Sequence, residues 1–250
     1  MITSRELHSS TATGTRGPKV KICGITTPEH ALAAARSGAD MLGMVFAPSR
    51  RQVSVEQAKA IRAALEPLGN RPVLVGVFVN ETNARVMQTA REVGLDIVQL
   101  SGDETPQEAA ACARYFPVIK ALRFPAGTAI QHALETCREY KMLATDISDR
   151  DELEREPHGP SKKLYFLVDA FCAGKYGGTG QLADWSLAAA LSAREEILLA
   201  GGLNPQNVAG ALAAAAPWGV DVSSGVESDG VKDAVLIESF IRAARSLQER

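Results

Sequence analysis

Residues 20–46, VKICGITTPEHALAAARSGADMLGMVF, contain two short apolar runs separated by an alanine-rich stretch. The runs VKICGI and MLGMVF have the length and the aliphatic, partly β-branched composition of buried strands. Thr27 followed by Pro28 is a typical helix start, and Gly38 is a typical helix stop. The stretch therefore predicts a strand, a helix and a second strand, which together form a βαβ unit with parallel strands.

The same alternation continues to the end of the chain, and a helical pattern follows every apolar run. Eight strand candidates begin at Val20, Met41, Val73, Ile97, Val118, Tyr165, Glu196 and Val220. Eight parallel strands in a chain of 250 residues fit a closed barrel better than an open doubly wound sheet. We therefore predict an α/β fold with one domain, a (β/α)8 barrel of the TIM-barrel type, over residues 18–250.

Several boundaries of this pattern can also be predicted. Residues 1–17 have no apolar run and no amphipathic period, so we expect a flexible N-terminal tail. Residues 148–163, SDRDELEREPHGPSKK, are rich in charge and contain two prolines, which predicts an exposed loop between the fifth and sixth strands. Asn204 with Pro205 predicts a helix start after the seventh strand, and Gly219 predicts a helix stop before the eighth.

The composition excludes several classes of protein. Hydrophobic residues make up 46% of the chain and charged residues 22%, which excludes a disordered or fibrous protein. Lys and Arg number 27 against 29 Asp and Glu, without a basic stripe, so we expect no nucleic-acid partner. No window reaches the roughly 18 apolar residues of a membrane-spanning helix. Because the N-terminus also lacks a secretory pattern, we expect a cytoplasmic protein with reduced cysteines, and no membrane partner.

The sequence gives no support for a metal or a redox cofactor. The histidines lie at positions 8, 30, 132 and 158, without the short spacing of paired metal ligands. The glycine-rich stretch GGTG, residues 177–180, does not match the dinucleotide pattern G-x-G-x-x-G. We therefore expect neither a bound metal nor a cofactor.

Polar residues interrupt strands that a barrel normally fills with Val, Ile and Leu. If their faces point inward, these side chains converge at the C-terminal mouth, where barrel enzymes build their active sites. Alternatively some of them point outward, and for Lys21 or Lys120 taken singly both directions stay open. Strands one and eight become neighbours on closure, so we predict that Lys21 and Asp221 face each other and neutralise one another. The polar positions are Lys21, Cys23, Gln99, Ser101, Lys120, Asp169, Asp221 and Ser223.

Glycines and serines follow strands seven and eight. In barrels these two loops commonly offer backbone N–H groups to a phosphate. The predicted phosphate ligands are Gly201 and Gly202 after strand seven, Ser223, Ser224 and Gly225 after strand eight, and Gly178 and Gly180 after strand six. The alternative is that these glycines only serve tight turns.

Six motifs, in this order along the chain, resemble phosphoribosylanthranilate isomerase of tryptophan biosynthesis. They are KICGIT (21–26), VGVFVN (75–80), LVDA (167–170), GGTG (177–180) with Asp184-Trp185 after it, AGGLNPQNV (200–208) and DVSSGVES (221–228). The resemblance covers nearly all of residues 19–247. Each string alone is weak, but six of them on successive βα units are hard to obtain otherwise.

The resemblance implies an Amadori rearrangement of N-(5-phosphoribosyl)anthranilate to the corresponding 1-deoxyribulose 5-phosphate. It implies Cys23 as the general base, Asp169 as the general acid and Arg51, in preference to Arg50, as a substrate-binding arginine. The chemistry requires these types, because ring opening needs a proton on the ring oxygen and enol-amine formation needs loss of a proton from carbon. A cysteine acts as a base only as the thiolate, so we expect nearby positive charge or N–H donors to lower the pKa of Cys23. Asp169 must be protonated part of the time, which favours burial or a nearby negative charge.

Two positions depart from the family pattern. Ser101 stands where a histidine is common, and Gln52 stands where a tyrosine often follows the arginine. Two further hypotheses stay open. Another phosphosugar barrel, such as indole-glycerol-phosphate synthase, would share the phosphate loops, and the changes at Ser101 and Gln52 leave open a barrel that binds its ligand without turnover. The cysteine of KICGIT opposes the first, and the joint presence of Cys23, Arg51 and Asp169 opposes the second.

Overall fold

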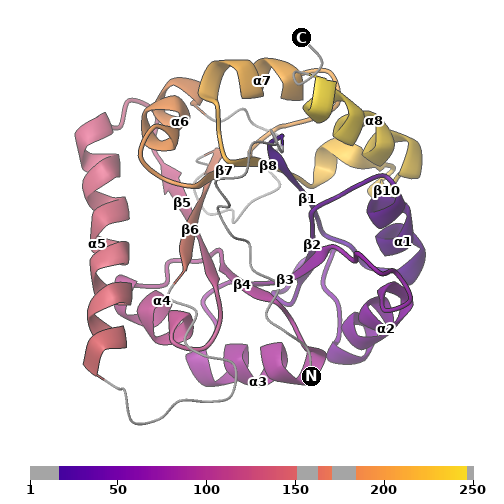
Figure 1. Cartoon of the computed structure of the whole chain (residues 1–250), viewed down its shortest axis with the longest axis horizontal. Coiled ribbons are helices and arrows are strands. Elements are labelled where there is room, and N and C mark those ends of the chain that lie inside the picture. Colours follow the sequence, from indigo (N-terminus) through magenta and orange to yellow (C-terminus); the bar gives the residue numbers. More distant parts are fainter. Residues whose placement is uncertain (1–16, 151–162, 171–183, 247–250) are drawn as a thin grey trace.

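The computed structural model describes residues 17–150, 163–170 and 184–246, and its centre is a closed barrel of eight parallel strands (Figure 1). Neighbours in the chain are neighbours in the sheet, and β8 pairs with β1 to close the ring. The strands are β1 (Lys19–Cys23), β2 (Met41–Val45), β3 (Val73–Phe78), β4 (Ile97–Leu100), β5 (Val118–Phe124), β6 (Leu164–Ala170), β7 (Ile197–Leu199) and β8 (Gly219–Val222). The prediction of a (β/α)8 barrel is confirmed.

Within the described residues, eight α-helices surround the strands (Figure 1). They are α1 (Pro28–Arg36), α2 (Val55–Leu65), α3 (Asn83–Val93), α4 (Pro106–Ala113), α5 (Ile130–Arg150), α6 (Trp185–Ser192), α7 (Val208–Ala215) and α8 (Ala234–Arg245). A short 3-10 helix, η1 (Ser224–Val226), and a hairpin of β9 (Glu227–Ser228) with β10 (Val231–Lys232) lie between β8 and α8. No helix among the described residues is long and apolar enough to cross a membrane.

Helix boundaries follow the predicted signals in α1 but not in α7. Thr27 caps α1 by accepting a hydrogen bond from the His30 backbone N–H. Helix α7 begins at Val208, three residues later than the predicted proline, because the Asn204 side chain closes a turn over the intervening residues. The predicted stop at Gly219 is also wrong. Ala216 ends α7 in the left-handed conformation with φ 41°, and Gly219 is the first residue of β8.

The loop predicted between strands five and six starts later in the structure than the predicted residue 148. Helix α5 continues to Arg150, so residues 148–150 are helical. The rest of the predicted loop, residues 151–162, lies outside the described residues, and so do residues 1–16 of the predicted tail. The extents of the tail and of the loop therefore stay predictions.

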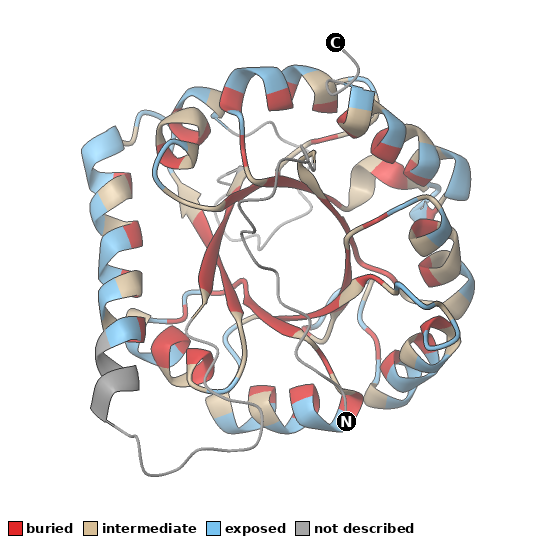
Figure 2. Cartoon of the chain, viewed as in Figure 1, coloured by how far each residue is buried: buried red, intermediate tan, exposed pale blue. Residues whose placement is uncertain are grey.

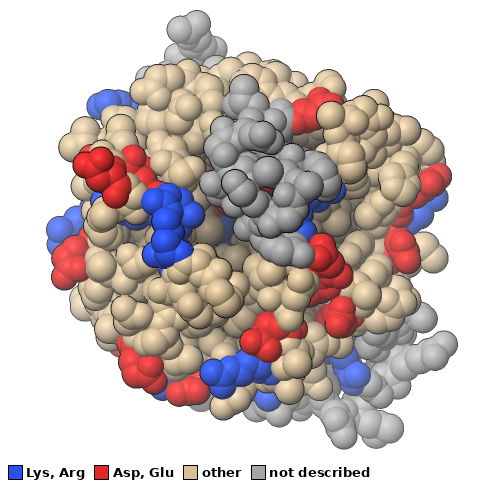
Figure 3. All heavy atoms as spheres, turned by 180° about the vertical axis from the view of Figure 1, so that it is seen from behind, with Lys and Arg blue, Asp and Glu red and all other residues tan. Residues whose placement is uncertain are grey.

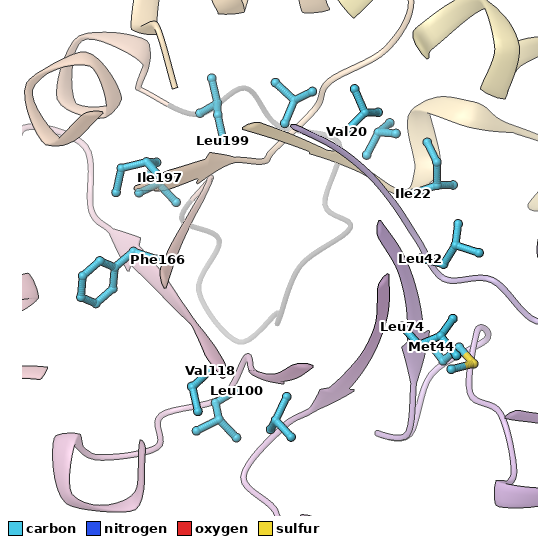
Figure 4. Packing of buried hydrophobic residues seen from close by; sticks show 14 of the residues in the cluster. Val20, Ile22, Leu42, Met44, Leu74, Leu100, Val118, Phe166, Ile197 and Leu199 are labelled. Atoms are coloured by element: carbon cyan, nitrogen blue, oxygen red, sulfur yellow. The ribbon is translucent and has the colours of Figure 1, made fainter. Parts of the chain in front are cut away.

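In the part of the chain that the structure describes, two apolar cores hold the barrel together. The larger core lies between the strands and the helices, where the helices bury their inner faces and expose their outer faces (Figure 2). Figure 4 shows that strand side chains such as Val20, Ile22 and Phe166 point outward into this core. The smaller core fills the barrel interior and includes Tyr165 and Leu167. Because side chains alternate along a strand, these memberships fix which face of each strand points inward.

The alternation separates the polar positions into two groups. Lys21 and Cys23 alternate with Val20 and Ile22, which belong to the outer core, so both polar side chains face the interior. The same comparison places Gln99, Ser101, Asp169, Asp221 and Ser223 on inward faces.

Lys120 points outward instead, because its neighbours Ile119 and Ala121 belong to the inner core. Its ammonium donates to the Glu104 carboxylate at 2.6 Å and to the Gly102 carbonyl at 2.8 Å. Both charged side chains are buried. Lys120 therefore supports the loop after β4 from outside and is not part of the barrel mouth.

Candidate active site

The predicted functional residues that the structure describes lie on one arc of the barrel rim. Cys23 is the last residue of β1, and Asp169 is the residue before the end of β6. Gly201 and Gly202 follow β7, Ser223 to Gly225 follow β8, and Arg51 follows β2. In the closed sheet the order β6, β7, β8, β1, β2 is continuous. The arc thus presents an aspartate, two glycine-containing loops, a cysteine and an arginine side by side, all at the C-terminal ends of the strands.

Lys21 and Asp221 form a buried ion pair below Cys23. The two residues are register partners across the β1–β8 seam, and Lys21 Nζ lies 2.7 Å from Asp221 Oδ1. Lys21 is completely buried. Burial alone would lower the pKa of Lys21, but the charge of Asp221 and its hydrogen bond to Lys21, together with the interaction with Cys23, outweigh burial and raise the pKa above its ordinary value. The predicted neutralisation of Lys21 by Asp221 is confirmed.

The Cys23 thiol is buried at the top of this pair. Burial raises its pKa above the ordinary value of a cysteine, and the nearby Lys21 and Lys232 ammonium groups only partly oppose that rise. The expected positive charge is therefore present, but the expected net lowering of the pKa is wrong. In the free protein at neutral pH, the thiol form predominates.

Gly43 of β2 leaves room beside the cysteine. A Cβ atom at this position would lie 2.9 Å from Cys23 Sγ and 3.1 Å from Lys21 Nζ. Both groups consequently border the same small space, which any larger side chain at position 43 would occupy.

Arg51 packs against the backbone of Gly24, the residue after Cys23. Gly24 has φ 81°, and a Cβ atom on it would lie 2.4 Å from Arg51 Cδ and 3.2 Å from Ser223 Oγ. A glycine is needed here both for the left-handed conformation and for the close approach. Arg51, the loop after β8 and the residue next to Cys23 are therefore packed together. Arg50 is the more exposed of the two arginines.

The loops after β7 and β8 contact one another. Gly201 and Gly202 have φ values of 88° and 62°, which glycine adopts readily. A Cβ atom on Gly225 would lie 1.9 Å from the Leu203 carbonyl oxygen, so only a glycine fits against the neighbouring loop. This contact joins the two predicted phosphate loops into one backbone surface. Gly178 and Gly180, the predicted third contribution, lie outside the described residues.

Asp169 faces the barrel interior on the other end of the arc. It is half-buried and is the register partner of Arg123 on β5. Strands β7 and β8 separate it from β1, so a ligand held by their loops would lie between the carboxyl group and the thiol.

Two residues of this region were missed in the sequence. Glu227 and Lys232 are register partners in the β9–β10 hairpin, and both side chains are buried against Arg51 and the loop after β8. The signal that could have found them is Asp229-Gly230, a typical two-residue hairpin turn.

The two departures from the family pattern follow β4 and β2, which are separated in the ring by β3. Ser101 is buried and its hydroxyl accepts a hydrogen bond from Gln99 Nε2 at 2.9 Å. Gln99 Oε1 is buried and has no hydrogen-bond partner among the described residues. Gln52 is exposed and donates to the Phe46 carbonyl oxygen at 3.1 Å, which holds the loop that carries Arg51.

Figure 3 shows basic and acidic side chains interspersed over one face of the molecule.

Comparison with known proteins identifies the family. The family model described as N-(5'-phosphoribosyl)anthranilate (PRA) isomerase matches residues 20–243. The chain belongs to this family. A relative named N-(5'-phosphoribosyl)anthranilate isomerase from Roseiflexus castenholzii is 48% identical over 231 residues, which is 91% of this chain and 98% of that protein.

Solved structures of the family have the same fold. The phosphoribosyl anthranilate isomerase of Thermotoga maritima matches with a TM-score of 0.74 at 35% identity, over 92% of this chain and 99% of that chain. A family member in complex with reduced 1-(o-carboxyphenylamino)-1-deoxyribulose 5-phosphate matches with a TM-score of 0.71, also at 35% identity, and the same shares of the two chains are covered.

Proposed function

We propose that this chain converts N-(5-phosphoribosyl)anthranilate into 1-(2-carboxyphenylamino)-1-deoxyribulose 5-phosphate, a step of tryptophan biosynthesis, and that Cys23 and Asp169 are its base and acid. The observation that carries the assignment of residues is the continuous arc from Asp169 on β6 to Arg51 on β2. The family assignment and the ligand named for the related structure support the reaction and a phosphorylated small-molecule substrate.

The phosphate end of the substrate would bind to the paired loops after β7 and β8. Backbone N–H groups of Gly201, Gly202, Ser224 and Gly225 and the Ser223 hydroxyl are the expected donors, with Gly178 and Gly180 as predicted additional donors. The Arg51 guanidinium on the opposite side of β1 would bind the anthranilate carboxylate, since a planar fork matches a carboxylate.

The reaction then needs one proton given and one taken. Asp169 donates a proton to the ring oxygen, the bond between C1 and that oxygen breaks, and C1 forms a double bond to the anthranilate nitrogen. Cys23 removes the proton from C2, and the electron pair of that bond forms the enol-amine. Tautomerisation moves a proton from the C2 hydroxyl to C1 and leaves a ketone at C2. The oxidation of C2 and the reduction of C1 balance, so the reaction consumes no external electron acceptor.

The raised pKa of Cys23 gives this mechanism a pH signature. The active base is the thiolate, whose fraction increases as the pH approaches the raised pKa of the thiol. We therefore expect kcat/KM of the wild-type protein to increase from neutral toward alkaline pH. Cys23→Ser should lose this alkaline increase together with its activity.

The experiment is to follow loss of anthranilate-type fluorescence with freshly made phosphoribosylanthranilate. Cys23→Ser and Asp169→Asn should each lower kcat by roughly 10²- to 10⁴-fold, with a much smaller change in KM. Cys112→Ser is the matched control, because Cys112 is a buried thiol on α4, away from the barrel mouth. Near-normal turnover of folded Cys23→Ser would refute the base assignment, and absence of turnover in the wild type would favour the binding-only barrel. The cytoplasm stays the expected compartment, since this chemistry requires a reduced Cys23.

A further inference from the structure

One buried carboxylate lies at the centre of the cations of this site. The Glu227 side chain is 4% exposed, and its oxygens accept hydrogen bonds from Arg50 Nη2 at 2.6 Å and Lys232 Nζ at 2.7 Å. They also accept from Arg51 Nε at 2.6 Å and Arg51 Nη2 at 2.9 Å. The Arg51 and Lys232 side chains, 14% and 1% exposed, already outnumber this one anion, so the cluster keeps an excess of positive charge without the exposed Arg50. Such an excess favours an anionic ligand nearby.

Glu227 lies in a short hairpin next to the loop after β8. Glu227 and Lys232 are paired across the β9–β10 hairpin, whose turn residues Asp229 and Gly230 have φ values of 51° and 81°. The hairpin begins directly after η1, which contains Ser224 and Gly225. The carboxylate is therefore held at a fixed position relative to the loop after β8.

Glu227 sets the direction of the Arg51 guanidinium. Two nitrogens of the guanidinium, Nε and Nη2, donate hydrogen bonds to the Glu227 carboxylate, and no described residue accepts a hydrogen bond from Nη1. The stem of Arg51 lies against Gly24, beside Cys23. One edge of the guanidinium is thus fixed by Glu227, while Nη1 is available to a ligand.

Lys232 connects the same carboxylate to the loop after β8. Its side chain is 1% exposed, and Nζ donates to the Ser223 carbonyl oxygen at 2.8 Å as well as to Glu227. Burial would raise the pKa of Glu227, but hydrogen bonds from Arg51 and Lys232 outweigh it and lower the pKa below the ordinary value. Glu227 therefore stays charged at neutral pH.

We propose that Glu227 is a positioning residue for both ends of the substrate: it orients Arg51 toward the anthranilate carboxylate and, through Lys232, fixes the loop after β8 for the phosphate. The proposal rests on the proposed function, because Arg51 and that loop bind substrate only if the isomerase assignment holds. Because Glu227 contacts the reactants only through other residues, it should affect binding more than the proton transfers.

The test compares binding of the two halves of the substrate. Anthranilate and inorganic phosphate are titrated separately into the folded protein by calorimetry, and kcat and KM are measured in parallel. Arg51→Ala should weaken only the binding of anthranilate, and Lys232→Met only the binding of phosphate. Glu227→Gln should weaken the binding of both ligands by about tenfold or more, which is a loss of about 1.4 kcal/mol or more in the binding free energy of each. In turnover, Glu227→Gln should raise KM at least tenfold and change kcat by less than about threefold.

Arg50→Gln is the matched control. Arg50 also contacts Glu227, but its side chain is 55% exposed, so this substitution should change either affinity by less than about twofold. If Glu227→Gln fails to fold, Glu227→Asp is the second variant. It keeps the negative charge but moves the carboxylate away from Arg51 and Lys232 by one carbon, so it should weaken the binding of both ligands by a smaller factor. The proposal is refuted if Arg51→Ala and Lys232→Met have the expected effects while folded Glu227→Gln binds both ligands like Arg50→Gln. If Arg51→Ala binds anthranilate normally and keeps the wild-type KM, the binding role assigned to Arg51 fails as well.

Discussion

Removing the charge of Asp221 should destabilise the barrel strongly. In Asp221→Asn the Lys21 ammonium would remain completely buried without its partner, which lies 2.7 Å away in the wild type. Breaking a buried ion pair in this way costs about 3–5 kcal/mol. Lys21→Met removes the more deeply buried charge and leaves Asp221, whose side chain is 10% exposed and can keep some hydration, so its effect should be smaller.

Equilibrium urea unfolding, followed by far-UV circular dichroism, measures both effects. With a slope near 3 kcal/mol per molar urea, Asp221→Asn should lower the midpoint by about 1 M or more. The double variant Lys21→Met, Asp221→Asn should be more stable than Asp221→Asn, because no buried charge remains. The raised pKa of Lys21 makes the stabilisation by this ion pair depend on pH. The stabilisation is fully present below the pKa of Lys21 in the unfolded chain and is lost only as the pH rises through the pKa in the folded chain. If the free-energy losses of the two single variants simply add in the double variant, the two charges are not coupled and the reasoning fails.

Two further predictions concern Gly225 and the buried cysteines of α4 and α5. Gly225→Ala should weaken inorganic phosphate binding at least tenfold, with little change in anthranilate binding. The Cβ of the alanine would lie 1.9 Å from the Leu203 carbonyl oxygen and force the two loops apart. An unchanged phosphate affinity, measured by calorimetry, would contradict this prediction. Burial raises the pKa of Cys112 to about 11 and of Cys137 to about 12, so the free energy of unfolding should decrease above about pH 8.5, where thiols of the unfolded chain lose protons first. Urea midpoints measured from pH 7 to 10 check the decrease, which should be smaller in a Cys112→Ala, Cys137→Ala variant.

The barrel and the Lys21–Asp221 pair could be predicted because both depend on periodicity and on strand order. Alternation places Lys21 and Cys23 on one face of a strand, and closure of the ring places β8 beside β1. Lys120 could not be placed in the same way. Strand β5 is buried on both faces, so the alternation within VIKALRF does not say which face points inward.

Other features escaped prediction because long-range contacts decide them. The pKa of Cys23 depends on how deeply the folded chain buries the thiol. The sequence does not show whether this burial or the charges of Lys21 and Lys232 have the larger effect on the pKa. Gly219 has the local signature of a helix stop, but pairing with β1 and β7 makes it a strand residue, and Ala216 ends the helix instead. Glu227 and Lys232 could have been found from the Asp229-Gly230 turn, whereas their contact with Arg51 depends on how the two loops pack.

The position of the arc also bears on how the ring stays closed. The seam between β8 and β1 joins the first and last strands of the chain, and the proposed ligand groups lie on both sides of it. A bound substrate would therefore link β8 to β1 and β2 and oppose opening of the ring at this seam. At a concentration 100 times its Kd, such a ligand stabilises the native state by about 2.7 kcal/mol. Backbone amides of β1 and β8 should consequently exchange with solvent more slowly in the liganded protein, while exchange in β4, far from the seam, follows the global unfolding alone.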